Sequence, residues 1–121
     1  MQQKFENHIA QNFSFLIGKN LLLATSGGLD SMVMVDLFHK LPFEIALAHC
    51  NFQLRGLESF GDQRFIQDYA ETNEIPLFLT QFDTEAFAND YKLSTQVAAR
   101  ELRYNWFYEI LETENYDYIL T

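Results

Sequence analysis

A run of four apolar residues, Leu21 to Ala24, limits what this chain can fold into more than any other stretch. Because no polar residue alternates with the apolar ones, the run predicts a strand buried on both faces, as in a parallel sheet. Residues 31–41 are apolar on nearly every side and precede Pro42, which predicts a buried helix. A tight turn with two glycines joins them, and glycine allows backbone conformations that are closed to other residues. The stretch therefore predicts a strand, a turn and a helix.

The turn has the features of an anion-binding site, and its sequence is Ser26-Gly27-Gly28-Leu29-Asp30-Ser31. Free N–H groups at a helix N-terminus point outward, and the helix dipole favours negative charge. The expected ligand is a phosphate, although the GxxxxGK[ST] and GxGxxG patterns are both absent. An acid in such a site, Asp30, is explained if a Mg²⁺ ion lies between the carboxylate and the phosphates. The alternative is an ordinary glycine turn in which Asp30 caps the helix.

Length and composition indicate one folded domain, residues 1–121. Hydrophobic residues make up 48% of the chain and aromatic residues 16%, which excludes a disordered chain. The net charge of −9 opposes broad nonspecific binding to nucleic acid. A single cysteine, Cys50, excludes an intrachain disulfide framework and suits a reducing cytosol. No basic-then-apolar leader and no apolar run of about 18 residues is present, so we expect a cytoplasmic protein without a membrane span.

The rest of the chain alternates predicted helices and strands. A lead-in helix is expected within residues 1–17, a helix starting near Ser59 with a capping box to Asp62, and a long helix from about Ser94 to Thr113. Further strands are expected at residues 45–48, 77–82 and from 118, with a loop or short helical turn over 83–90. This order predicts an α/β fold with a doubly wound parallel sheet, Rossmann-like, with helices on both faces.

Spacing also predicts which side chains of the helices are buried. The predicted apolar positions are Phe5, Ile9, Phe13 and Leu16 in the lead-in helix, Phe65, Ile66, Tyr69 and Ala70 in the next, and Ala98, Leu102, Trp106 and Ile110 in the long helix.

Polar residues follow the second strand, where ligands bind in open parallel sheets. His49 either contacts a nucleotide or is a partly buried histidine bonded to the backbone, and the sequence favours neither. Cys50 is interpreted as a small core residue because no basic neighbour is visible to lower its pKa. Arg55 follows in a loop, where it holds a phosphate or a substrate carboxylate or is simply solvated.

The long helix carries two arginines, Arg100 and Arg103, three residues apart and so on neighbouring positions of one face. Neither has an acid three or four positions away, and both lie toward the positive end of the helix dipole. Unpaired guanidinium groups suit a bound polyphosphate or a tRNA backbone. The alternative is a tertiary salt bridge to one of the many acids.

Three motifs of the chain occur together. They are the Ser26–Ser31 turn, His49-x-Asn51-x-x-Leu54-Arg55-Gly56-x-x-Ser59-x-x-Asp62, and Ala99-Arg100-x-x-Arg103-Tyr104. The turn resembles the pyrophosphate loop of the N-type ATP pyrophosphatases, which have an adenine nucleotide alpha hydrolase-like fold. The combination resembles the tRNA(Ile)-lysidine synthase family. Members use ATP and Mg²⁺ to adenylate the C2 position of the wobble cytidine in an isoleucine tRNA, and L-lysine then displaces AMP.

The resemblance implies a role for each motif. Ser26, Gly27, Gly28, Leu29, Asp30 and Ser31 would bind the pyrophosphate of ATP, with Asp30 holding Mg²⁺. His49 and Asn51 would flank the nucleotide. Arg55, Arg100 and Arg103 would bind substrate, and Asp30 and the last two arginines would take part in catalysis.

The chain departs from the family pattern in two ways. The family usually has a second histidine after Asn51, where this chain has Phe52. The family also continues past the fourth strand with a His- and Asp-rich segment and tRNA-recognition domains. We therefore expect an ATP-binding fragment, the amino-terminal part of the catalytic domain, that binds tRNA mainly through domains not in the chain.

Other functions remain open at the level of sequence. A tRNA thiolase of the same superfamily usually needs paired cysteines, and Cys50 stands alone. A synthetase that amidates a small metabolite would leave the arginine motif unexplained. A non-catalytic module that senses ATP or AMP is a third alternative. The oligomeric state is not predicted by any feature of the sequence.

Overall fold

The computed structural model describes residues 1–41, 43–54 and 56–121. Its centre is a four-stranded sheet in the order β3-β2-β1-β4, and every neighbouring pair is parallel. The strands are β1 (Asn20–Ala24), β2 (Glu44–Asn51), β3 (Leu77–Gln81) and β4 (Tyr118–Leu120). The predicted doubly wound α/β fold is confirmed.

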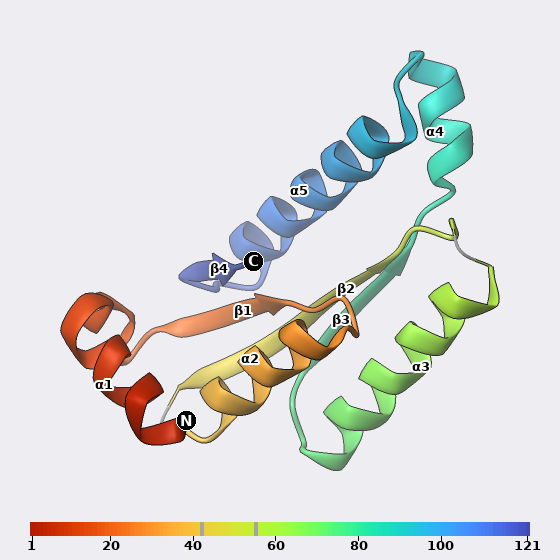
Figure 1. Cartoon of the computed structure of the whole chain (residues 1–121). Coiled ribbons are helices and arrows are strands. Elements are labelled where there is room, and N and C mark those ends of the chain that lie inside the picture. Colours follow the sequence, from red (N-terminus) through yellow and green to blue (C-terminus); the bar gives the residue numbers. More distant parts are fainter. Residues whose placement is uncertain (42, 55) are drawn as a thin grey trace.

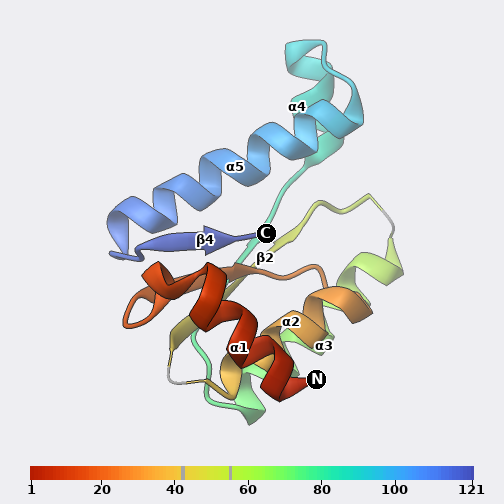
Figure 2. The same ribbon diagram turned by 60° about the vertical axis from the view of Figure 1, so that its left-hand side comes forward.

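Helices cover both faces of this sheet (Figure 1). They are α1 (Gln2–Asn12), the short 3-10 helix η1 (Ser14–Leu16), α2 (Leu29–His39), α3 (Leu57–Thr72), α4 (Thr84–Tyr91) and α5 (Thr95–Thr113). Helices α2 and α3 lie on one face and α5 lies on the other, while α4 projects past the sheet beside the start of α5 (Figures 1 and 2). No helix in the described part of the chain is long and apolar enough to cross a membrane.

Strand β1 separates two hydrophobic cores. Leu21 and Leu23 belong to the core under α1, α2 and α3, whereas Leu22 belongs to the core under α5. All three leucines are fully buried. Successive side chains of a strand point to opposite faces, so a strand covered on both sides needs apolar residues at every position. This is the physical basis of the apolar run that predicted a parallel sheet.

The chain path creates a crevice at one edge of the sheet. From β1 the chain moves to β2 and then β3 by way of α2 and α3 on the same face. Helix α5 then crosses the opposite face and returns the chain to β4, on the other side of β1. The strand order thus reverses at β1, and open α/β sheets bind ligands at the carboxyl ends of the strands at such a point.

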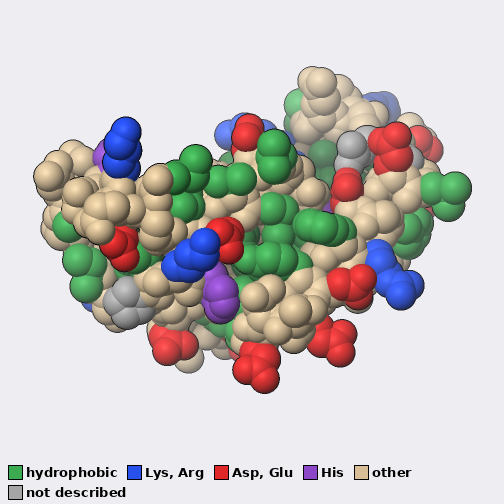
Figure 3. All heavy atoms as spheres, turned by 60° about the horizontal axis from the view of Figure 1, so that its bottom comes forward, with side chains coloured by type: hydrophobic (Ala, Val, Ile, Leu, Met, Phe, Trp, Pro, Cys, Tyr) green, Lys and Arg blue, Asp and Glu red, His purple; other side chains and the backbone are tan. Residues whose placement is uncertain are grey.

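Two helical predictions need correction. Helix α2 is not a buried helix: only Val35 and Phe38 are buried, while Leu29 and Val33 are exposed, because the sheet covers one side of it alone. Figure 3 shows hydrophobic side chains between charged ones on the face that α2 and α3 form.

Helix α3 begins at Leu57, so Ser59 is its third residue and the predicted Ser59 capping box is wrong.

Apolar spacing placed most buried residues correctly, but not all. In α5, Phe107 is buried together with Ala98 and Ile110, whereas the predicted Leu102 and Trp106 are only half-buried. Phe65 of α3 is 53% exposed, and Phe13, which follows α1, is also exposed. A spacing pattern defines a stripe on a helix but leaves its exact rotation against the sheet open, since rings next to the stripe compete for the same space. The segment 83–90 is mostly the short helix α4, capped by the Asp83 side chain.

We predict that Leu22→Ala destabilises the domain by roughly 2–5 kcal/mol, because it removes a fully buried side chain and leaves a cavity under α5. Val33→Ala, on the exposed side of α2, is the matched control and should change the free energy of unfolding by less than about 0.5 kcal/mol. Urea denaturation followed by circular dichroism measures both. Equal losses in the two variants would contradict the assignment of Leu22 to a closed core.

Candidate functional site

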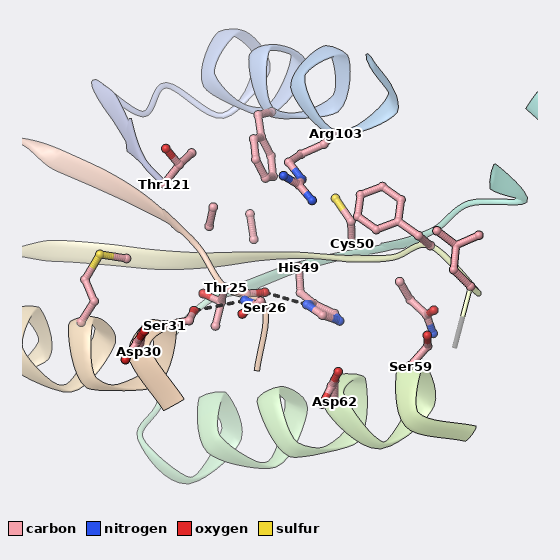
Figure 4. Close-up of a pocket in the computed structure, with 17 residues that line it drawn as sticks. Thr25, Ser26, Asp30, Ser31, His49, Cys50, Ser59, Asp62, Arg103 and Thr121 are labelled. Atoms are coloured by element: carbon pink, nitrogen blue, oxygen red, sulfur yellow. Dashed lines mark hydrogen bonds between the residues drawn. The ribbon is translucent and has the colours of Figure 1, made fainter. Parts of the chain in front are cut away.

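A cavity of about 640 Å³ opens at the carboxyl ends of β1, β2 and β4 (Figure 4). It lies between the start of α2 and the first turns of α3 on one side and the middle of α5 on the other. Its polar lining comes from Thr25, Ser26, Asp30, Ser31, His49, Asn51, Ser59, Asp62, Arg103 and Thr121. The topology therefore brings the turn, the residues after β2 and one arginine of α5 into one site.

The turn between β1 and α2 closes on itself through its two serines. The Ser26 N–H donates to Ser31 Oγ at 3.1 Å, and the Gly28 N–H donates to Ser26 Oγ at 3.2 Å. Gly28 is the N-cap of α2, and within the described chain no side chain caps this helix end. The N–H groups of the first helical turn and the positive end of the dipole thus remain available to an anion.

Asp30 lies in the first turn of α2, is exposed, and lines the cavity. It does not cap the helix, so the capping alternative is excluded. The described residues contain no group of three or more acids, histidines or cysteines placed to hold a metal. A Mg²⁺ ion is nonetheless compatible with this geometry, because Mg²⁺ is usually held by one or two carboxylates, phosphate oxygens and water.

Only one of the two glycines of the turn has a conformation closed to other residues. Gly27 has φ +90°, and a Cβ there would lie 3.1 Å from the Cβ of Asp62 on α3. Gly28 has φ −75°, an ordinary extended conformation. The tight approach of α3 to the turn therefore requires glycine at position 27 alone.

His49 is the most buried titratable group of the cavity, with 5% of its surface exposed. Its Nδ1 lies 2.6 Å from the carbonyl oxygen of Thr25, so the backbone-bonded alternative describes its main contact. Burial lowers the pKa of His49 below its ordinary value, while the Thr25 bond and the negative charge of Asp62 act in the opposite direction. No residue of the described chain bonds to its Nε2. A direct contact with a nucleotide stays a prediction.

Asn51 is 1% exposed and holds the loop after β2 in place. Its Nδ2 donates to Gln63 Oε1 at 2.9 Å, and its Oδ1 accepts from the Gln53 N–H at 2.9 Å. The predicted nucleotide contact of Asn51 is not tested by these bonds.

Cys50 is half-buried and lines the cavity. Burial raises the pKa of its thiol to about 12, with nearby Arg103 acting in the opposite direction. Cys50 packs against the core under α5, in line with its interpretation as a small apolar residue, but it is only half-buried and a basic neighbour does lie close in space.

The two arginines of α5 diverge. Arg103 points into the cavity, with its guanidinium carbon 5.2 Å from the centre of the Phe52 ring (Figure 4). Arg100 lies over Tyr104, in a separate shallow depression that also includes Asn105 and Tyr108. Neither forms an ion pair with an acid among the described residues. The two arginines do occupy neighbouring positions of the helix, about 60° apart, but they line different depressions of the surface.

The structure adds residues that the sequence did not single out as site residues. Thr25 and Phe52 line the cavity, and so does Asp62, which the sequence analysis included in a helix cap and in the second motif without giving it a role in the site. Their place just after β1 and β2, and one turn into α3, is the signal that could have identified them. Arg55 lies outside the described residues, so its predicted role is not addressed.

Comparison with known proteins links this geometry to a family. A family model described as "PP-loop domain" matches residues 1–121. Among curated proteins, the tRNA(Ile)-lysidine synthase of Bacteroides thetaiotaomicron is 41% identical over 112 residues, covering 93% of this chain and 26% of that protein. The protein of the same name from Chlorobaculum tepidum is 35% identical over 124 residues, covering 99% and 38%. That from Shouchella clausii is 34% identical, covering 100% and 27%. The chain thus spans between about a quarter and two fifths of these relatives.

We predict that Gly27→Ala destabilises the domain by roughly 1–2 kcal/mol, because alanine is strained at positive φ and its Cβ would press against Asp62. Gly28→Ala is the matched control one residue away and should lie within about 0.5 kcal/mol of the parent. Thermal unfolding of both variants is the measurement. If Gly28→Ala is the more harmful change, the assignment of the strained position is wrong.

Proposed function

This chain belongs to the PP-loop family, and from that premise we propose that it is the ATP-binding part of a tRNA(Ile)-lysidine synthase. Membership of the family implies use of ATP. The observation that carries the proposal is a single cavity with the glycine turn at the start of α2 on one wall and Arg103 on the other. Residues 1–121 would form a single domain of the enzyme.

The proposed reaction has two steps, both at the C2 position of a cytidine in isoleucine tRNA. In the first, the oxygen at C2 attacks the α-phosphorus of ATP, the bond between the α and β phosphates breaks, and pyrophosphate leaves. In the second, an amino group of lysine attacks C2, and the adenylated oxygen leaves as AMP with its bonding electrons. Lysine and the tRNA are thus proposed substrates, and tRNA modification would take place in the cytoplasm.

The Ser26–Ser31 turn is assigned to the leaving pyrophosphate. Its two serine bonds fix the backbone, and the uncapped start of α2 directs N–H groups and the helix dipole toward the cavity. Donors that are oriented before the reaction stabilise the charge that develops on the leaving group, without reorganising during the step.

Asp30 is assigned to a Mg²⁺ ion that accompanies ATP. The carboxylate is exposed in the first turn of α2, on the cavity wall where the phosphates would lie. Bound there, the ion would offset the negative charge of the phosphates. Without it, Asp30 would repel the nucleotide.

Arg103 is assigned to the reacting nucleotides and Arg100 to the tRNA. Arg103 extends into the cavity against Phe52, which restricts its guanidinium to the wall opposite the turn. From there it can bond to the α-phosphate as AMP is transferred. Arg100 lies outside the cavity beside two tyrosines, an arrangement suited to a sugar–phosphate backbone rather than to the reacting atoms.

We predict that Asp30→Asn weakens binding of Mg·ATP at least about 10-fold, or 1.4 kcal/mol, because a metal ligand is lost. Binding of ATP in the presence of EDTA should stay equal or improve, since a negative charge is removed. Calorimetric titrations of the parent and the variant, each with and without Mg²⁺, measure the four affinities. Equal losses with and without the metal would remove Asp30 from the metal site.

The activity test uses the complete gene product that carries these residues, with isoleucine tRNA, radiolabelled lysine and Mg·ATP. We predict ATP-dependent incorporation of label into tRNA. Arg103→Ala should lower kcat at least about 10-fold, or 1.4 kcal/mol, and Arg100→Ala should mainly raise the KM for tRNA. Both variants should melt within a few degrees of the parent.

Pyrophosphate release distinguishes the outcomes of this assay. Release that depends on tRNA but occurs without lysine incorporation would indicate another tRNA-modifying enzyme of the family. No release with any tRNA would indicate a nucleotide-binding module and would overturn the proposed reaction.

A further inference from the structure

We infer that His49 is a positioning residue, whose imidazole fixes the backbone where β1 leaves the sheet and so sets the orientation of the Ser26–Ser31 turn. The inference rests on the proposed function only in taking this turn to be the phosphate site. In this role His49 acts through Thr25.

The bond to Thr25 defines the state of the ring. Nδ1 of His49 lies 2.6 Å from the carbonyl oxygen of Thr25, as the dashed line in Figure 4 shows. A carbonyl oxygen can only accept, so Nδ1 must carry the proton. Because burial lowers the pKa of the ring and so favours its neutral form, Nε2 carries no proton, and no described residue bonds to it. The ring is thereby held in one tautomer and one orientation.

This bond takes the place of a backbone hydrogen bond that is missing where β1 and β2 stop pairing. The pairing of β1 with β2 ends at Ala24 and Ala48, where the Thr25 N–H still donates to the Ala48 carbonyl at 2.9 Å. In a regular parallel ladder, the Cys50 N–H would donate next to the Thr25 carbonyl. Among the described residues no backbone N–H does so, and the His49 side chain donates instead. The strands can therefore separate after Thr25 without leaving its buried carbonyl unpaired.

Among the described residues the side-chain hydrogen bonds of the turn are internal, so its orientation depends on this anchor. The two serine bonds join residues of the turn to one another and fix its shape, but not its direction relative to the sheet. Thr25 itself is held at three points, since its hydroxyl also donates to the Leu23 carbonyl at 3.0 Å. Losing the imidazole bond would let the turn rotate as a unit, away from the wall that carries Arg103.

Two substitutions separate the hydrogen bond from the bulk of the side chain. His49→Asn places an amide N–H near the position of Nδ1 and can keep the bond, whereas His49→Leu fills similar space without a donor. His39→Leu, at the exposed end of α2, is the matched control. Hydrogen–deuterium exchange of the ligand-free protein is read over residues 24–31 and, as an internal reference, over α5.

We expect His49→Leu to speed exchange over residues 24–31 about 10-fold, the effect of losing roughly 1.4 kcal/mol of local protection, with α5 unchanged. His49→Asn should stay within about 3-fold of the parent, and His39→Leu should match the parent. The affinity for Mg·ATP should fall in the same order. A long-range ¹H–¹⁵N NMR correlation of the parent should place the imidazole proton on Nδ1.

Unchanged exchange over residues 24–31 in a folded His49→Leu protein would overturn the inference, and so would a proton on Nε2. If His49→Leu does not fold, His49→Gln replaces it, because its amide reaches the position of Nε2 instead. Protection of the turn by asparagine but not by glutamine would support the inference, and equal protection would overturn it. If the turn loosens as expected but the parent does not bind Mg·ATP, the proposed function fails while the positioning role stands.

Discussion

Burial of β1 between two helical layers is the constraint on which the rest of the structure depends. Leu21 and Leu23 pack under α1, α2 and α3, and Leu22 packs under α5, so neither face of the strand meets water. The strand also pairs with β2 on one edge and β4 on the other, because the order of the strands reverses at β1. The same reversal separates the carboxyl ends of the strands and creates the cavity. Folding and site formation therefore have one physical cause.

Sequence reasoning succeeded where a pattern determines a structure directly. Residue types and spacing were enough to predict the apolar strand β1, the start of α5 at Ser94 and the turn between Thr25 and α2. Sequence reasoning failed where a side chain's surroundings depend on how a helix is rotated against the sheet or on residues far away in the chain. Arg100 and Arg103 share a stripe on a helical diagram, but only Arg103 faces the sheet. The sequence could not decide the role of His49, since its partner, Thr25, lies 24 residues away in the chain, just after β1.

Electrostatics in the cavity depends on the backbone as well as on side chains. The chain has a net charge of −9, and two acids, Asp30 and Asp62, lie on the cavity wall. Among the described lining residues the opposing side-chain charge is Arg103, and the remaining positive potential comes from the start of α2. In the proposed function the nucleotide and its metal ion therefore bind together, because Asp30, which would hold the cation, and Asp62 both repel a polyphosphate without metal.

The state of Cys50 gives the protein a built-in indicator of its own integrity. Because burial raises the pKa of the thiol to about 12, little of it is the reactive thiolate near neutral pH, and alkylating reagents should react slowly with the folded domain. Unfolding exposes this half-buried sulfur completely and restores the ordinary pKa of a thiol. Because the chain has no other cysteine, the rate of labelling counts transient openings around the cavity without any engineered probe. A ligand bound in the cavity would lower this rate of labelling.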